Sequence, residues 1–210
     1  MVRLICFSPT IYKLNRNDRL PMDINEISSI VQQQFLLRRK HFPTIFVELD
    51  GTGIQVLALP RLDEKEGNTF RRARMLFDAG RTFGQRTEWT QPSVTGLCMT
   101  SFSVPQGLFK KGILVVKMDE SNRLNCTARF YEVRKDASRI DVSFLENPFL
   151  SGEGLVSPLL PAFMLGIDVV RSQQSTKEAH RMLSALLQEY EHMIRRIVYY
   201  ERFPGINAHY

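Results

Sequence analysis

The feature that most constrains the fold is a set of apolar positions that repeat every second residue between residues 94 and 145. Along 123–134 the apolar members are Leu124, Cys126, Ala128 and Phe130, and polar residues separate them. A repeat of two is typical of a β-strand with one buried face. The expected strands are 94–104, 112–118, 123–134 and 139–145. Because short turns join them, we expect an antiparallel meander.

Two segments instead show the helical repeat of apolar residues. Asp23 with Glu26, and Ser175 with Glu178, have the spacing of a capping box, in which the first side chain accepts hydrogen bonds from free amides of the first turn. We therefore predict helices over about 23–40 and about 176–201. Pro204-Gly205 follows the second helix and is expected to end it.

Weaker patterns suggest the remaining elements. Strands are expected at 2–7 and 10–14, and a hairpin at 44–50 and 54–59, where Asp50-Gly51 favours a tight turn. The segment 69–86 is expected to start as a short helix or strand and to continue as a loop, because it contains Gly80 and Gly84. Residues 146–161 are expected to be a long loop, and 162–170 a possible last strand.

These elements predict an α+β fold, in which the two helices pack against an antiparallel sheet or sandwich. The chain has 210 residues, of which 43% are hydrophobic and 24% charged, so it can bury a substantial core. We expect a single domain over residues 1–210.

Charge and cysteine content suggest the location and the partners. The formal net charge is +6, which favours an anionic partner such as nucleic acid or an acidic membrane. Cys6, Cys98 and Cys126 are widely spaced and odd in number, as is typical of reduced thiols in the cytoplasm. The sequence shows no signal peptide and no transmembrane helix. We expect a cytoplasmic protein that is not secreted, with peripheral membrane association as an option.

The strongest functional feature is an arginine-rich segment with interleaved phenylalanines. Residues 69–86 contain five arginines and one acid, Asp78. Guanidinium groups bind phosphates, and aromatic rings stack on bases or enter lipid headgroups, although the arginines could also be a solvated outer face. The predicted anion-binding residues are Arg71, Arg72, Arg74, Arg81, Arg86, Arg38, Arg39, Lys40, Lys110 and Lys111.

Two apolar segments suggest self-association. Residues 155–165 are apolar and interrupted by prolines, so they form either a docking loop or a buried connection. Residues 197–200 are four consecutive apolar or aromatic residues, which cover more than one helix face. The predicted interface residues are Leu155, Leu159, Leu160, Val198, Tyr199 and Tyr200.

No catalytic, metal-binding or cofactor-binding pattern is found. The histidines are His41, His180, His192 and His209. His180 and His192 are about 120° apart on an ideal helix, so they do not form a zinc pair. Phosphate-binding and nucleophile motifs are absent, and Cys98 among apolar neighbours is more typical of a core residue than of a nucleophile. We therefore predict no catalytic residues, metal or cofactor.

These observations favour a non-enzymatic, self-associating assembly protein that binds an anionic membrane or a nucleoprotein. Small viral matrix proteins are of this physical type, although no motif links the chain to them. The alternatives are an RNA- or single-stranded-DNA-binding module, a scaffold subunit of a larger complex and, last, an enzyme of unrecognised type. No small-molecule substrate is indicated.

Overall fold

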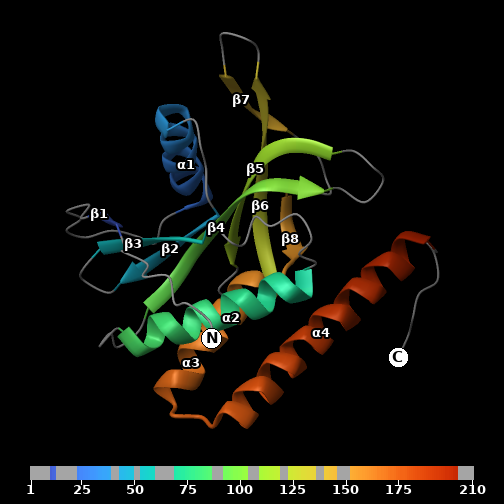
Figure 1. Cartoon of the computed structure of the whole chain (residues 1–210). Coiled ribbons are helices and arrows are strands. Elements are labelled where there is room, and N and C mark those ends of the chain that lie inside the picture. Colours follow the sequence, from blue (N-terminus) through green and yellow to red (C-terminus); the bar gives the residue numbers. More distant parts are fainter. Residues whose placement is uncertain are drawn as a thin grey trace. The chain divides into compact units, whose positions relative to one another are not determined.

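The structure is a computed structural model that describes residues 10–12, 23–38, 43–49, 53–59, 69–86, 92–103, 109–118, 123–135, 140–145 and 152–202. The chain divides into two compact units. The first contains residues 1–67 and 88–155 and holds the sheet. The second contains residues 68–87 and 156–210 and is helical; we call it the helical unit. Figure 1 labels the elements of both.

The first unit is built on an antiparallel sheet. Its strands are β1 (Thr10–Tyr12), β2 (Thr44–Leu49), β3 (Gly53–Ala58), β4 (Pro92–Ser103), β5 (Phe109–Met118), β6 (Asn125–Lys135), β7 (Ile140–Leu145) and β8 (Gly152–Val156). The order is β1-β3-β2-β4-β5-β6-β7, and β8 pairs with β6. The predicted hairpin is β2–β3, and the predicted meander is β4 to β7. The register shifts at Phe46/Val47 and at Met99/Ser101, where bulges increase the local twist.

Helix α1 (Ile24–Arg38) covers one face of this sheet (Figure 1). Its buried residues Ile27, Val31 and Phe35 pack with Phe46 of β2 and Ile113 of β5. The predicted cap is confirmed, because the Glu26 amide donates a 2.7 Å hydrogen bond to Asp23 Oδ1. The sequence thus fixes both where α1 begins and which face it buries.

The helical unit consists of α2 (Thr69–Arg86), α3 (Leu159–Arg171) and α4 (Thr176–Arg202). Its core residues are Ala73, Leu76, Phe77 and Phe83 of α2, Leu160, Phe163 and Ile167 of α3, and Ala179, Leu183 and Leu187 of α4. The Glu178 amide donates to Ser175 Oγ at 3.2 Å, which confirms the second predicted cap. The described packing partners of α4 are α2 and α3. Packing of this helix against the sheet therefore stays a prediction.

A tight turn joins α3 to α4. The Gln174 amide donates to the Val169 carbonyl at 2.9 Å and the Gln173 amide to the Val170 carbonyl at 3.1 Å. This is a Schellman arrangement, which requires a left-handed residue just after the helix. Gln173 has that conformation, with φ of 53°. The turn therefore places Ser175, the cap of α4, only a few residues after the end of α3.

Two sequence predictions are wrong in this unit. Residues 69–86 form one continuous helix rather than a short element and a loop, because Gly80 and Gly84 are places of close helix contact rather than breaks. Residues 162–170 belong to α3 rather than to a strand, and the expected loop 146–161 contains β8 and the start of α3. Pro161 lies in the first turn of α3, where its missing N–H is harmless.

The predicted α+β class is confirmed, with an N-terminal and a C-terminal helix. The expected strand 2–7 lies outside the described residues, and 10–14 is represented by the short β1. The expectation of a single domain stays a prediction.

Candidate anion-binding face of the helical unit

The net charge of the chain is concentrated in the helical unit. Residues 68–87 and 156–210 contain eleven lysines and arginines against six acids, a net charge of +5 out of +6 for the whole chain. The first unit therefore has a net charge close to zero. The candidate anion-binding surface therefore lies on the helical unit, which consists of α2, α3 and α4.

Most of this net positive charge comes from α2. Helical geometry places the arginines of α2 on different sides of the helix. On an ideal helix Arg71, Arg74 and Arg81 fall within about 80° of one another, whereas Arg72 lies about 100° from Arg71 on the other side. Arg71 and Arg74 are exposed, and Arg81 is half-buried. Asp78 lies on the same stripe and is exposed as well. The predicted cluster is thus a stripe of three arginines around one acid, and Arg72 is separate from it.

A shallow groove borders this stripe, between α2 and α4. It has a volume of about 260 Å³ and is lined by Arg74, Phe77, Asp78, His180, Leu183, Ser184 and Leu187. Phe77, Leu183 and Leu187 are buried and form an apolar floor. The edge ring contact between Phe70 and Tyr190, with centroids 6.1 Å apart, joins the same two helices further along. The groove combines an apolar floor with a polar rim that contains Arg74.

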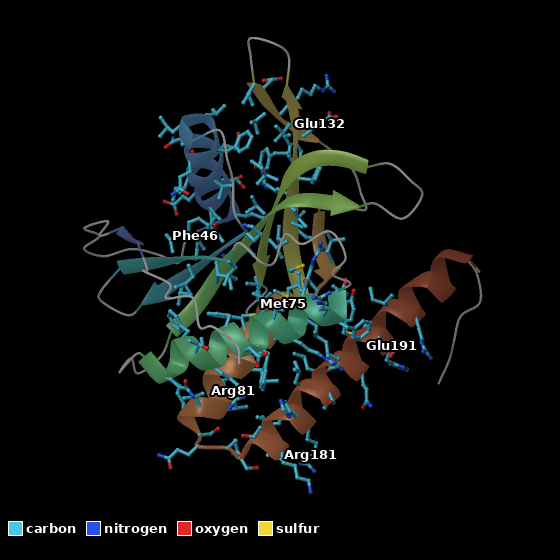
Figure 2. All side chains as sticks on the ribbon, viewed as in Figure 1. Phe46, Met75, Arg81, Glu132, Arg181 and Glu191 are labelled. Carbon is cyan, nitrogen blue, oxygen red and sulfur yellow. The ribbon has the colours of Figure 1, made fainter. Side chains whose placement is uncertain are left out.

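Two arginine side chains of α2 have unused donors. Within the described part of the chain, neither Arg72 Nε nor Arg81 Nε has a hydrogen-bond acceptor, although both atoms are buried. The guanidinium carbon of Arg81, a residue labelled in Figure 2, is 6.0 Å from the centroid of the Phe77 ring, a cation–π arrangement. Because both Nε atoms are buried, an anion outside the helical unit cannot reach them in this arrangement, and the exposed arginines of the stripe are Arg71 and Arg74.

Two arginines of α4, Arg181 and Arg195, have glutamate partners on the same helix. Arg181 donates to Glu178 at 2.9 Å, and Arg195 pairs with Glu191 one turn away (Figure 2). These are exposed helical pairs of opposite charge, which add little stability but neutralise the charge locally. By sequence α2 has five arginines and one acid, whereas α4 has five basic residues and four acids, so α2 carries the larger share of the net positive charge.

The other predicted cations lie in several places. Arg86 ends α2 and Arg38 ends α1, with side chains outside the described set. Lys110 and Lys111 lie in β5, where they pair in register with Phe102 and Ser101 of β4, and their side chains are likewise not described. Arg39 and Lys40 lie outside the described residues.

Two of the three predicted self-association residues of the first apolar segment are buried. Leu159 and Leu160 are buried in the first turn of α3, and Leu155 in β8 is half-buried. Of the two alternatives for this segment, a docking loop or a buried connection, the burial of Leu159 and Leu160 agrees with the buried connection. Val198, Tyr199 and Tyr200 lie in α4, but their side chains are outside the described set.

Sequence reasoning missed the groove residues His180 and Ser184 as neighbours of Arg74. Their spacing of four places them on one side of α4, but the position of that side against α2 depends on tertiary packing. It also missed the exposed apolar residues Leu36, Leu37 and Phe144.

Cys126 has the properties of a core residue. It is buried, and desolvation raises the pKa of its thiol to about 12. The thiolate required for nucleophilic attack is therefore scarce at neutral pH. Among the described residues, no three histidines, cysteines or acids gather where they could hold a metal ion.

The chain matches no protein-family model, no curated protein and no solved structure. Within the described residues, no helix is both long and apolar enough to cross a membrane.

Proposed function

We propose that this chain is a non-enzymatic protein that binds an anionic surface through the α2 face of its helical unit, and that it acts by assembling on that surface. The observation that carries the proposal is the concentration of positive charge. The helical unit holds five of the six net charges, and Arg71, Arg74 and Arg81 share one stripe of α2.

The stripe favours a surface with many phosphates rather than one small anion. Arg71 and Arg74 are exposed and about one helical turn apart, so each can meet a different phosphate group. Asp78 lies between Arg74 and Arg81 and would repel a single anion that contacted both. A headgroup layer or a nucleic acid strand instead offers many phosphates from which each arginine can choose.

A second candidate is binding of single-stranded nucleic acid by the sheet. Phe144 of β7 is half-exposed, its ring centroid is 5.7 Å from that of Tyr131, and the Arg129 guanidinium lies 5.9 Å from it. An exposed aromatic ring beside a cation is the kind of site on which a base stacks. The charge distribution favours the first candidate, because the unit that holds Phe144 is almost neutral.

The two candidates are separated by flotation with vesicles and by fluorescence anisotropy with labelled oligonucleotides, each across a salt series. We expect binding to vesicles that contain phosphatidylserine, weakening as salt screens the arginines, and no binding to pure phosphatidylcholine. Binding to the oligonucleotide that Phe144→Ala abolishes, with no binding to vesicles, would favour the second candidate and contradict the first.

A further inference from the structure

The groove between α2 and α4 has charges of both signs on its rim. Arg74 and Asp78 are four residues apart in α2, and both are exposed. Such positions are neighbours on a helix surface, with Cβ atoms about 5–6 Å apart. Within the described part of the chain, neither side chain has an ion-pair partner. The groove therefore offers one cation and one anion, a helical turn apart, to the group that occupies it.

The opposite rim comes from α4 and is polar. The aromatic contact described above joins the start of α2 to the later part of α4, whereas the groove joins the middle of α2 to the earlier part of α4. The two helices are therefore antiparallel. Arg74 and Ser184 lie towards one end of the groove, and Asp78 and His180 lie towards the other.

The size and the floor of the groove limit what it can hold. Phe77, Leu183 and Leu187 are buried beneath the rim and make the floor apolar. The volume of about 260 Å³ is slightly below the roughly 300–1,000 Å³ of pockets that hold a drug-sized ligand. The site is therefore suited to a small group that is polar at the rim and has carbon atoms for the floor.

We propose that this groove binds the headgroup of an aminophospholipid, with the phosphate at Arg74 and the primary ammonium at Asp78. The phosphate accepts hydrogen bonds from the Arg74 guanidinium and the Ser184 hydroxyl, and the ammonium donates to the Asp78 carboxylate. Two carbon atoms link the phosphate ester to the ammonium, a length that suits charges one helical turn apart. The inference rests on the proposed function and names the headgroup that the groove selects within the anionic surface.

The pair of charges distinguishes this occupant from others. A purely anionic headgroup such as phosphatidylglycerol brings no cation to Asp78, and covering a carboxylate without a partner costs free energy. Phosphatidylcholine has a cation, but its trimethylammonium group has no N–H to donate. A nucleic acid strand offers phosphates without ammonium groups. Of these ligands, the aminophospholipid headgroup alone meets both charges with hydrogen bonds.

The test uses vesicles with a fixed fraction of phosphatidylglycerol, in which phosphatidylethanolamine replaces phosphatidylcholine at constant net charge. In flotation we expect the wild-type chain to bind about fivefold more tightly after the replacement, because the ammonium gains a charged hydrogen bond. Asp78→Asn should bind both kinds of vesicle equally. Glu189→Gln removes an exposed acid of α4 that does not line the groove, so it should keep the fivefold preference. Circular dichroism checks that both variants are folded.

A second measurement reports occupancy of the groove directly. In methyl NMR of the full chain, monomeric dihexanoylphosphatidylethanolamine should shift the signals of Leu183 and Leu187, and dihexanoylphosphatidylcholine at the same concentration should not. Ser184→Trp places a large ring on the exposed rim and should abolish these shifts. Ala185→Trp, at an exposed position outside the groove, should keep them. Unshifted signals in the wild-type chain would overturn the inference.

The remaining outcomes separate this inference from the proposed function. If the wild-type chain binds phosphatidylglycerol vesicles but gains nothing from phosphatidylethanolamine, the headgroup inference fails and the proposed function stands. If it binds no anionic vesicle, both fail. If free phosphoethanolamine shifts the two leucine signals as strongly as the short-chain lipid does, the ligand is a soluble aminophosphate and the lipid assignment is wrong.

Discussion

Gly80 of α2 lies directly against the backbone of Phe163 in α3, so closely that a Cβ atom on Gly80 would be 2.1 Å from the Phe163 carbonyl oxygen. The contact is reciprocated, because a Cβ atom on Gly166 would be 2.2 Å from the Phe77 carbonyl oxygen. Glycine at these two places lets α2 and α3 cross at short range. This crossing fixes α2, and with it the arginine stripe, within the helical unit.

Gly80→Ala should therefore destabilise the helical unit, by about 1–3 kcal/mol, because backbone atoms cannot move aside as a flexible side chain can. Gly84→Ala is the matched control, since its Cβ would be 3.3 Å from the Ile167 Cα. There the gain in helix propensity, about 1 kcal/mol, should offset the tighter contact. Urea denaturation followed by helical circular dichroism measures both. Equal stability of the two variants would contradict this account of the crossing.

Leu160 should behave as a core residue rather than as an interface residue. It is 1% exposed in α3, so Leu160→Ala should lower the stability of the helical unit by about 2–5 kcal/mol. The loss should not depend on protein concentration, because no subunit contact is removed. Thermal unfolding at several concentrations checks this. A concentration-dependent loss would restore the interface interpretation.

The helical unit should become more stable when Gln173 is replaced by glycine. The left-handed conformation of Gln173, with φ of 53°, is unfavourable for a residue with a side chain and natural for glycine. Gln173→Gly should stabilise the helical unit by roughly 0.5–1 kcal/mol, and Gln174→Gly should not. A lower melting temperature for Gln173→Gly would show that the side chain contributes more than the strain costs.

Asp23 gives the first unit a defined response to acid. The hydrogen bond from the Glu26 amide lowers the pKa of Asp23 below its usual 3.8, with further contributions from Asn25 and Lys117. Because the folded pKa is the lower one, the stabilisation is present above 3.8 and is lost as the pH falls through the folded pKa. Asp23→Ala should therefore be less stable than wild type at neutral pH, and the difference should shrink as the pH falls through the folded pKa. A difference that is constant with pH would mean that the charge has no role in the cap.

The elements that sequence predicted well are those with a strong local cause. Asp23 and Ser175 are caps whose partners lie three residues away, and the alternation at Leu124 and Cys126 needs only one buried face. The errors have non-local causes. Gly80 and Gly84 resemble helix breaks until α3 packs against them. The proline-interrupted segment around Leu159 fits either a docking loop or a buried connection, until its residues are seen to form a helix that packs with α2 and α4.

The candidate site could likewise be predicted only where its cause is local. The composition of the arginine-rich segment is visible in sequence, but which arginines share a face became clear only once residues 69–86 formed a single helix. The groove needs Arg74 of α2 and His180 of α4 side by side, about a hundred residues apart in the chain. No local pattern encodes such a pairing.

The most direct test of the central claim is flotation of Arg71→Ala/Arg74→Ala on vesicles that contain phosphatidylserine, measured against Arg181→Ala/Arg195→Ala. Both variants remove two positive charges from the helical unit, but Arg181 and Arg195 lie on α4, where they pair with Glu178 and Glu191, and not on the α2 stripe. At roughly 1 kcal/mol per basic residue near the surface, the first variant should bind about thirtyfold more weakly than wild type. The second should bind nearly as well as wild type, and both should keep their helical circular dichroism. Equal binding by the two folded variants would contradict the claim that the α2 stripe is the anion-binding face.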